Sequence, residues 1–333
     1  MFNRHHQGRR HTNIVFVIFR LILSVFMFVV LLIGIYSAYK HFSGLDPLKL
    51  DPVSVLNNVI TARTPKQFLN ALPSFKVFPK TPESVTPPQS VTVRFKFLLL
   101  ADSHTDNVNL AKAIEQAKSA YPDLKFIIGL GDYSDVGTIA QLKNAKTVFD
   151  ASGLRYFLVP GDHDLWDCRN RGISAISCFN EVFGPSYQSF EFDNFKFLLL
   201  DNSDDYLGLT EAENGWIDGE LEKVKQGSFK GVLVFLHEPL FHPSSDRIMG
   251  KIEASLKQQA KSLMFQLKDA KVKQVFAGDI HFFSQYSEPV TGLSMVTIGA
   301  VTIERNPQAP RFAIMSVLED GSIKAEDVII LGI

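Results

Sequence analysis

The chain has 333 residues, of which 46% are hydrophobic and 21% charged, so it can bury one large core and still carry additional segments. Its 34 basic and 35 acidic residues nearly cancel, giving a formal net charge of −1. This balance excludes the overall basic excess that is typical of nucleic-acid-binding proteins, and no acidic tail is present.

The N-terminal 39 residues predict a basic tail, residues 1–13, followed by one transmembrane helix, residues 14–39. The tail contains three arginines and no acid, and Leu21–Tyr39 is a run of 19 residues without a charge. At 1.5 Å per residue this run would span roughly 28 Å, close to the ~30 Å hydrocarbon core of a bilayer. Because the arginines precede the span, the positive-inside rule predicts a cytoplasmic N-terminus and a catalytic domain outside the cell membrane.

Two other interpretations of this run are a buried core helix and a cleaved signal peptide. A core helix would carry a polar stripe, whereas this run is apolar all round. Tyr36 stands where cleavage by a signal peptidase requires a small residue. We therefore expect an uncleaved anchor. Residues 40–90 hold eight of the sixteen prolines, which predicts a semi-stiff stalk with one short helix over Asp51–Leu72.

From Val91 onward, the pattern predicts one α/β domain, residues 91–333, in which strands alternate with helices and antiparallel strands come late. The predicted strands are Phe95–Leu100, Lys125–Leu130, Tyr156–Val159, Gly231–Leu236, Val272–Ala277, Met295–Ile298 and Arg311–Val317, with a hairpin over Phe190–Leu200. The predicted helices are Asn109–Ala120, Ile139–Ala151, Ala212–Lys225 and Lys251–Lys268.

Cys168 and Cys178 are the two cysteines of the chain and lie ten positions apart. In an oxidising compartment they can close a small loop. The alternative, two unrelated thiols, stays open at this point. Neither cysteine belongs to a CxxC or CxxH pattern, so a structural zinc site is not expected.

Five predicted buried strands run directly into acids or histidines, at the carboxyl ends where open α/β sheets build their sites. Asp102, Asp132 and Asp162 are spaced 30 residues apart, one strand–helix unit each. Each motif alone is weak evidence for a metal site, because about one Asp-x-His is expected by chance in a chain of this composition. The ordered set, however, indicates a metal centre. The candidate metal ligands are Asp102, His104, Asp132, Asp162, His237, Asp279 and His281.

The order Asp-x-His, Gly-Asp-x-x-Asp, Gly-Asp-His-Asp, His and Gly-Asp-x-His resembles that of the calcineurin-like metallophosphoesterases from about Val91 to the C-terminus. The resemblance implies a four-layer α-β-β-α sandwich with a dinuclear metal centre. It implies that the first metal is bound by Asp102, His104 and His281, the second by Asp162, His237 and Asp279, and that Asp132 bridges both. It also implies that His163 stands beside the substrate with its ring oriented by Asp135.

Asp162 and Asp279 depart from the family pattern, which usually has Asn and His at these positions. Four carboxylates against two divalent ions lower the formal charge of the cluster from about +2 to about 0. Oxygen-rich ligation favours Mn²⁺, Mg²⁺ or an iron over Zn²⁺. A more neutral centre also leaves more of the phosphate binding to nearby donors. The alternative is a degenerate centre with an empty second site.

The expected function is hydrolysis of a phosphate ester, as a phosphomonoesterase or a phosphodiesterase. A metal-bridging hydroxide would attack phosphorus, with His163 as general acid or transition-state stabiliser. The expected partners are a small phosphate-ester molecule or a lipid head group, and the membrane through the N-terminal helix. A nuclease is disfavoured because no basic aromatic groove is evident. The alternative from another class is a tethered, metal-binding scaffold of the same fold that has lost turnover.

Overall fold

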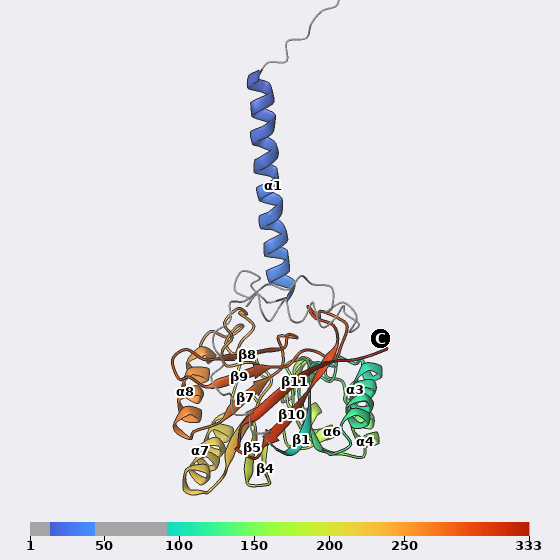
Figure 1. The fold of residues 1–333 in the computed structure, drawn as a ribbon, viewed down its shortest axis with the longest axis vertical. Coiled ribbons are helices and arrows are strands. Elements are labelled where there is room, and N and C mark those ends of the chain that lie inside the picture. The colour runs from blue at the N-terminus through green and yellow to red at the C-terminus, as the bar shows by residue number, and fades with distance from the viewer. Residues whose placement is uncertain (1–13, 44–91, 333) are drawn as a thin grey trace, which may run out of the picture.

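The computed structural model describes residues 14–43 and 92–332. Helix α1 (Ile14–Ser43) runs over the predicted anchor (Figure 1). Its large apolar side chains between Ile22 and Ile35 are 46–62% exposed. Within the described residues, no helix combines the length and the apolarity needed to cross a membrane. The predicted basic tail, the stalk after residue 43 and the short helix over Asp51–Leu72 lie outside the described residues.

The first of two β-sheets has five strands in the order β11-β10-β1-β2-β3. Its adjacent strands β1 (Val93–Leu100), β2 (Leu124–Leu130) and β3 (Arg155–Val159) are parallel. Strands β10 (Arg311–Leu318) and β11 (Ile323–Ile329) are antiparallel to their neighbours. Helices α3 (Asn107–Ala120) and α4 (Ile139–Ala151) connect the parallel strands. Each crossover returns the chain to the same starting edge, so β1, β2 and β3 all end at one side of the sheet.

The second sheet has six strands in the order β4-β5-β6-β7-β9-β8, with β5, β6, β7 and β9 parallel. Helices α7 (Glu211–Gln226) and α8 (Leu256–Asp269) make the crossovers. The strands are β4 (Gln188–Phe192), β5 (Phe195–Leu199), β6 (Gly231–Phe235), β7 (Gln274–Ala277), β8 (Ser284–Ser287) and β9 (Ser294–Thr297). The predicted β4–β5 hairpin turns at Asp193 (φ 52°) and Asn194 (φ 63°), as a two-residue type I′ turn requires.

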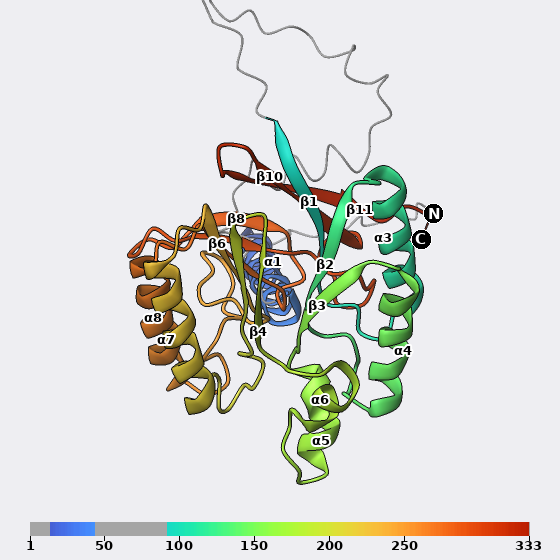
Figure 2. The same ribbon diagram turned by 90° about the horizontal axis from the view of Figure 1, so that it is seen from below.

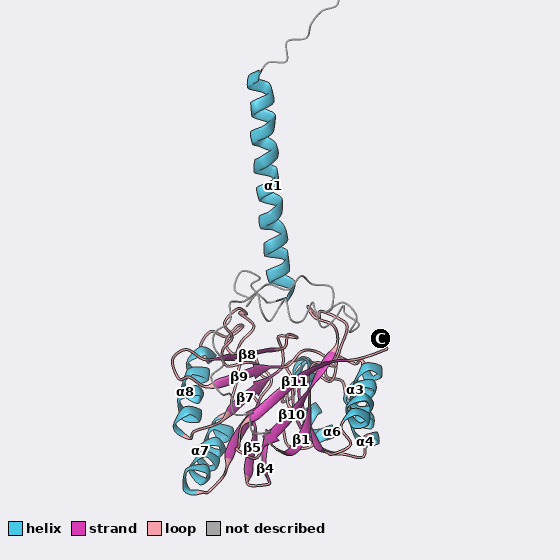
Figure 3. Ribbon diagram, in the orientation of Figure 1, coloured by secondary structure: helices cyan, strands magenta, loops and turns pink. Residues whose placement is uncertain are grey.

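The two sheets face each other across an aromatic core, and helices cover both outer faces (Figures 2 and 3). Phe97 of the first sheet and Phe197 of the second meet edge to face with ring centroids 5.7 Å apart, a favoured geometry for aromatic pairs. Helices α3 and α4 pack on the first sheet, and α7 and α8 on the second. The molecule is thus a mixed α/β sandwich of two sheets with flanking helices, in the predicted layer order.

Several elements differ from the prediction. Helix α8 begins at Leu256 rather than Lys251, because residues 248–257 form successive turns in which an amide bonds the carbonyl three residues earlier. Strands β8 and β11 and the short helices α5 (Trp166–Asn170) and α6 (Ser177–Phe183) were not predicted. β8 and β11 alternate exposed and half-buried residues without a continuous apolar run, and the helices are too short to show a period of 3.6 residues.

Cys168 on α5 and Cys178 on α6 form a disulfide with their Cα atoms 5.8 Å apart. Both are buried and pack with Leu142 of α4 and Val182 of α6. The alternative of two unrelated thiols is therefore excluded. The bridge closes a loop that begins at Cys168, four positions after the end of the Gly-Asp-His-Asp motif at Asp164.

We expect the double variant Cys168→Ser/Cys178→Ser to lose about 2–3 kcal/mol of unfolding free energy, because the bridge restricts a short loop in the unfolded chain. Urea unfolding followed by tryptophan fluorescence reports on this region, since Trp166 lies on α5. Reduction of the parent protein should reproduce the effect of the double variant. An unchanged unfolding midpoint after reduction would contradict the prediction.

Candidate metal centre

The candidate ligands meet at the carboxyl ends of strands from both sheets. Asp102, Asp132 and Asp162 follow the adjacent parallel strands β1, β2 and β3. His237 and Asp279 follow β6 and β7, which are neighbours in the second sheet. Main-chain bonds tie these strand ends together, from the Asp102 amide to the Gly131 carbonyl (3.1 Å) and from the Gly278 amide to the His237 carbonyl (3.0 Å). The site therefore depends on the packing of one sheet against the other.

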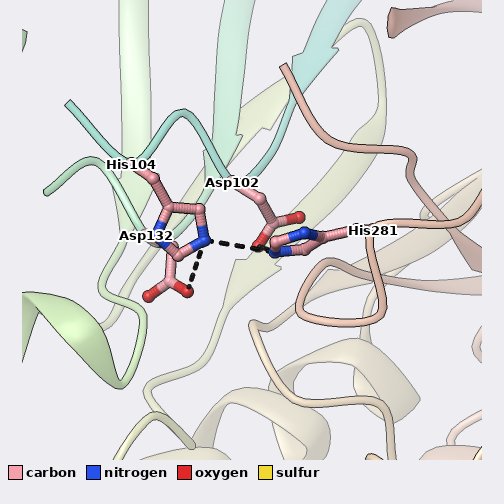
Figure 4. A group of neighbouring side chains, drawn as sticks. All are labelled: Asp102, His104, Asp132 and His281. Atoms are coloured by element: carbon pink, nitrogen blue, oxygen red, sulfur yellow. Dashed lines mark hydrogen bonds and ion pairs between the residues drawn. The ribbon is translucent and has the colours of Figure 1, made fainter. Parts of the chain in front are cut away.

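A first group consists of Asp102, His104, Asp132 and His281, whose ligand atoms all lie within 4.8 Å of one another (Figure 4). His104 Nε2 lies 3.1 Å from His281 Nε2 and 3.4 Å from Asp132 Oδ2. The other ring nitrogen of His281, Nδ1, lies 3.2 Å from the Arg305 carbonyl. Donation of Nδ1–H to that carbonyl leaves the lone pair of Nε2 directed into the group, which is the arrangement of metal-binding histidines.

A second group consists of Asp132, Asp162 and His237. His237 Nε2 lies 3.4 Å from Asp162 Oδ1 and 3.6 Å from Asp132 Oδ1. Its Nδ1 lies 2.6 Å from the Leu130 carbonyl, so Nδ1–H donates there and Nε2 again offers a lone pair. Asp132 belongs to both groups, with Oδ2 toward the first and Oδ1 toward the second. This is the position expected of a bridging carboxylate.

These residues fit divalent cations. Asp102 Oδ2, Asp132 Oδ2 and His237 Nε2 are fully buried and have no hydrogen-bond partner among the described residues. Burial raises the pKa of Asp102 to about 7 and the pKa of Asp132 well above its usual range. Burial also lowers the pKa of His104 to about 3, which keeps that ring neutral and able to bind a metal. Burial lowers the pKa of His281 as well. Buried carboxylates beside the neutral rings of His104 and His281 are costly to fold, and a divalent cation would offset that cost.

The backbone is strained at the same residues. Of the ten non-glycine residues with positive φ in the described part of the chain, five are Asp102, His104, Asp132, Asp279 and His281. Such conformations are rare for non-glycine residues and concentrate at functional sites. Gly131 (φ +95°) is also constrained, because a Cβ there would lie 2.6 Å from His237 Nδ1.

Asp279 is the predicted ligand that the structure places apart from both groups. Its Oδ1 accepts a hydrogen bond from Arg247 Nη2 at 2.8 Å, and its amide donates to Asp102 Oδ1 at 3.1 Å. Sequence reasoning did not single out Arg247, which lies in the loop between β6 and α8 without a strand directly before it. No local pattern could have identified it.

His163 lies on the short helix η2 (His163–Leu165) beside the first group, with its ring centroid 4.7 Å from that of His104. Its Nδ1 lies 2.7 Å from the backbone carbonyl of Asp135. Asp135 therefore contacts the His163 ring through its main chain. Its carboxylate instead accepts a hydrogen bond from Thr105 Oγ1 at 2.5 Å. Trp166, which sequence reasoning did not connect with the site, stacks on His163 with a centroid distance of 3.9 Å.

The sequence model of the calcineurin-like phosphoesterase family matches residues 95–283, which is more than half of the chain and includes every candidate ligand. The chain belongs to the calcineurin-like phosphoesterase family. The family and its named relatives are hydrolases of phosphate-ester bonds.

The human serine/threonine-protein phosphatase CPPED1 is 25% identical over 219 residues, covering 62% of this chain and 68% of that protein. The 3′,5′-cyclic-nucleotide phosphodiesterase alr5338 of Nostoc sp. is 25% identical over 214 residues, covering 60% and 75%. Among solved structures, the purple acid phosphatase PPD1 from yellow lupin seeds aligns with a TM-score of 0.51 at 14% identity, covering 72% of this chain and 52% of that one. The last similarity concerns the fold alone.

Two further residues of this phosphoesterase have structural roles. Asp164 is fully buried, and its carboxylate accepts hydrogen bonds from Ser134 Oγ (2.7 Å) and the Gly161 amide (3.0 Å), so it links the loops after β2 and β3. His242, which lies between β6 and α8, is also buried. Its Nδ1 accepts from the Ser245 amide at 2.9 Å, which fixes the loop after β6.

We expect Asp132→Asn to lower the affinity for Mn²⁺ by more than about 100-fold, because ligand losses should exceed the 10- to 100-fold effect of supporting residues and Asp132 faces both groups. Isothermal titration calorimetry with Mn²⁺ measures this effect. The matched control is Asp123→Asn, which removes an exposed carboxylate paired with Lys96 at 2.9 Å. Parent-like Mn²⁺ binding by Asp132→Asn would remove Asp132 from the centre.

Proposed function

We propose that this protein hydrolyses phosphate monoesters or diesters with two divalent metal ions. The first ion would be bound by Asp102, His104 and His281, and the second by Asp162 and His237. Asp132 would lie between them. The observation that carries the proposal is the placement of the two Asp132 oxygens, each toward a separate group of buried ligand atoms. Asp279 is the further ligand predicted for the second ion.

Ions bound at these positions would activate water and neutralise phosphate oxygens. The protein itself supplies a proton donor and the means to orient it. Because His163 Nδ1 faces the Asp135 carbonyl at 2.7 Å, Nδ1 carries a hydrogen in either protonation state. The doubly protonated ring would then give its Nε2 proton to the departing oxygen and remain as the neutral imidazole with the hydrogen on Nδ1. Stacking on Trp166 restricts rotation of the ring, which keeps Nε2 aimed in one direction.

The proposed substrate is a small phosphate-ester molecule or a lipid head group. The relatives named above are a protein phosphatase and a cyclic-nucleotide phosphodiesterase, and these substrates share only the phosphate-ester bond. With oxygen atoms from up to four carboxylates, the centre favours Mn²⁺, Mg²⁺ or an iron over Zn²⁺.

The second candidate function is a metal-binding scaffold without turnover. The observation in its favour is that Asp279 bonds to Arg247 rather than joining the second group. Turnover of p-nitrophenyl phosphate and bis-p-nitrophenyl phosphate with Mn²⁺, Mg²⁺, Fe²⁺ and Zn²⁺ distinguishes the two functions. Hydrolysis of either compound supports the enzyme, and the ratio of the two rates identifies a monoesterase or a diesterase. No hydrolysis with any of these ions would favour the scaffold.

We expect His163→Ala to bind metal like the parent but to lose about 10²- to 10⁴-fold in kcat, the usual contribution of a positioned acid or base. His163 is absent from both ligand groups, so metal content measured by plasma mass spectrometry should not change. Steady-state kinetics with the better of the two p-nitrophenyl substrates gives kcat. Activity equal to that of the parent would show that the role assigned to His163 is wrong.

We also propose that residues 14–39 anchor the protein in the cell membrane, with the N-terminus cytoplasmic and the catalytic domain outside. The uncharged run Leu21–Tyr39 and the helical conformation of α1 support the proposal, which goes beyond the finding that no described helix is both long and apolar enough to cross a membrane. The Cys168–Cys178 disulfide supports the outer location, because disulfides persist in oxidising compartments.

A reporter fused after Ile333 tests this topology. We expect a reporter that is active only outside the cytoplasm to be active and the fusion protein to stay in the membrane fraction after a carbonate wash. Replacing two residues of the uncharged run, Val29→Lys and Val30→Lys, should release the protein from that fraction. A reporter that proves to be cytoplasmic would overturn the orientation.

A further inference from the structure

The Arg247–Asp279 ion pair stands at the edge of the second ligand group. The two atoms, Nη2 and Oδ1, are 2.8 Å apart, and the side chains are 29% and 11% exposed. A partly buried, charge-assisted bond of this length is about twice as strong as a neutral hydrogen bond. Asp279 Oδ1 therefore has a charged partner that competes with a metal ion for this carboxylate.

The loop that carries Arg247 is fixed from within the fold. Buried His242 accepts hydrogen bonds from the amides of Ser244 and Ser245, and its Nε2 lies 2.9 Å from Ser284 Oγ. The Ser245 hydroxyl in turn accepts from the Arg247 amide at 3.1 Å. The backbone at Arg247 is thus fixed by the loop, so the place from which the guanidinium reaches Asp279 does not depend on the ion pair alone.

We propose that Arg247 is a positioning residue that withholds Asp279 from the second metal ion, so that the two metal sites are unequal in affinity. The inference rests on the metal centre of the proposed function. The first site has four residues from one group, whereas the second has Asp162, His237 and the shared Asp132. The ion pair also changes the charge of the loaded centre. The charges of four carboxylates and two divalent ions cancel. The guanidinium of Arg247 then gives the loaded centre a net charge of about +1, which attracts a phosphate.

The test is calorimetric titration of the full, metal-stripped chain with Mn²⁺. The parent should bind one ion tightly and a second ion measurably but more weakly. Arg247→Gln should tighten the second step about tenfold, equivalent to ~1.4 kcal/mol, because Asp279 becomes free to bind the second ion. The first step should change by less than about twofold. Arg247→Lys, which keeps the charge and a donor, should behave like the parent.

The Asp279→Asn background separates release of a ligand from simple removal of charge. If Arg247 acts by holding Asp279, then Arg247→Gln tightens nothing when Asp279 is already Asn. Tightening that persists in this background would overturn the proposal, as would a second step that is unchanged or weaker in Arg247→Gln alone.

Arg169→Gln is the matched control, since Arg169 pairs with Asp204 at 3.2 Å and its loss changes the net charge equally. It should leave both steps unchanged, and equal tightening in this control would also overturn the proposal. A parent protein that binds no Mn²⁺ at all would instead refute the metal centre itself. The failure of the proposed function is therefore distinguishable from the failure of this inference.

Discussion

The burial of several carboxylates close together is the constraint on which the rest of this structure depends. Asp102 and Asp132 are completely buried, and burial favours their neutral forms. A fold that retains such groups does so at a cost to its own stability, which is usual where chemistry requires them. The sandwich compensates with backbone amides, as at Asp102 Oδ1 and Asp132 Oδ1, and leaves other carboxylate oxygens for cations.

The two-sheet architecture makes this confinement possible. Parallel strands deliver one acid each from the first sheet, and the second sheet contributes the imidazole of His237 and the loop that contains His281. Neither sheet could assemble a complete ligand group alone, because His281 follows β7 whereas Asp102 follows β1. The phenylalanines between the sheets therefore set the distances within the centre. A change in how the two sheets pack would therefore also change the distances between the metal ligands at the strand ends.

Much of this architecture could be predicted from the sequence, because the decisive signals are local. A continuous apolar run that ends in Asp or His, as at Leu100 or Leu236, indicates both a buried strand and a residue at its carboxyl end. The positions of β8 and β11 could not be predicted in this way, since their exposed faces interrupt any apolar run. The Arg247–Asp279 pair joins residues 32 positions apart and depends on how a loop folds back. The contact between the Asp135 carbonyl and His163 could not be predicted from the sequence either, because every residue type has a backbone carbonyl.

The disulfide has a consequence for the proton donor. Trp166 and Cys168 share the five-residue helix α5, so the covalent bond to α6 holds the indole that lies against the imidazole of His163. The aromatic layer between the sheets takes no part in this attachment. Cleavage of the sulfur–sulfur bond would therefore make helix α5 and the Trp166 indole more mobile against the imidazole while the β-sandwich stays folded. The reason is that segments with few core contacts open first. A reducing agent would therefore impair proton donation by His163 before it unfolds the domain.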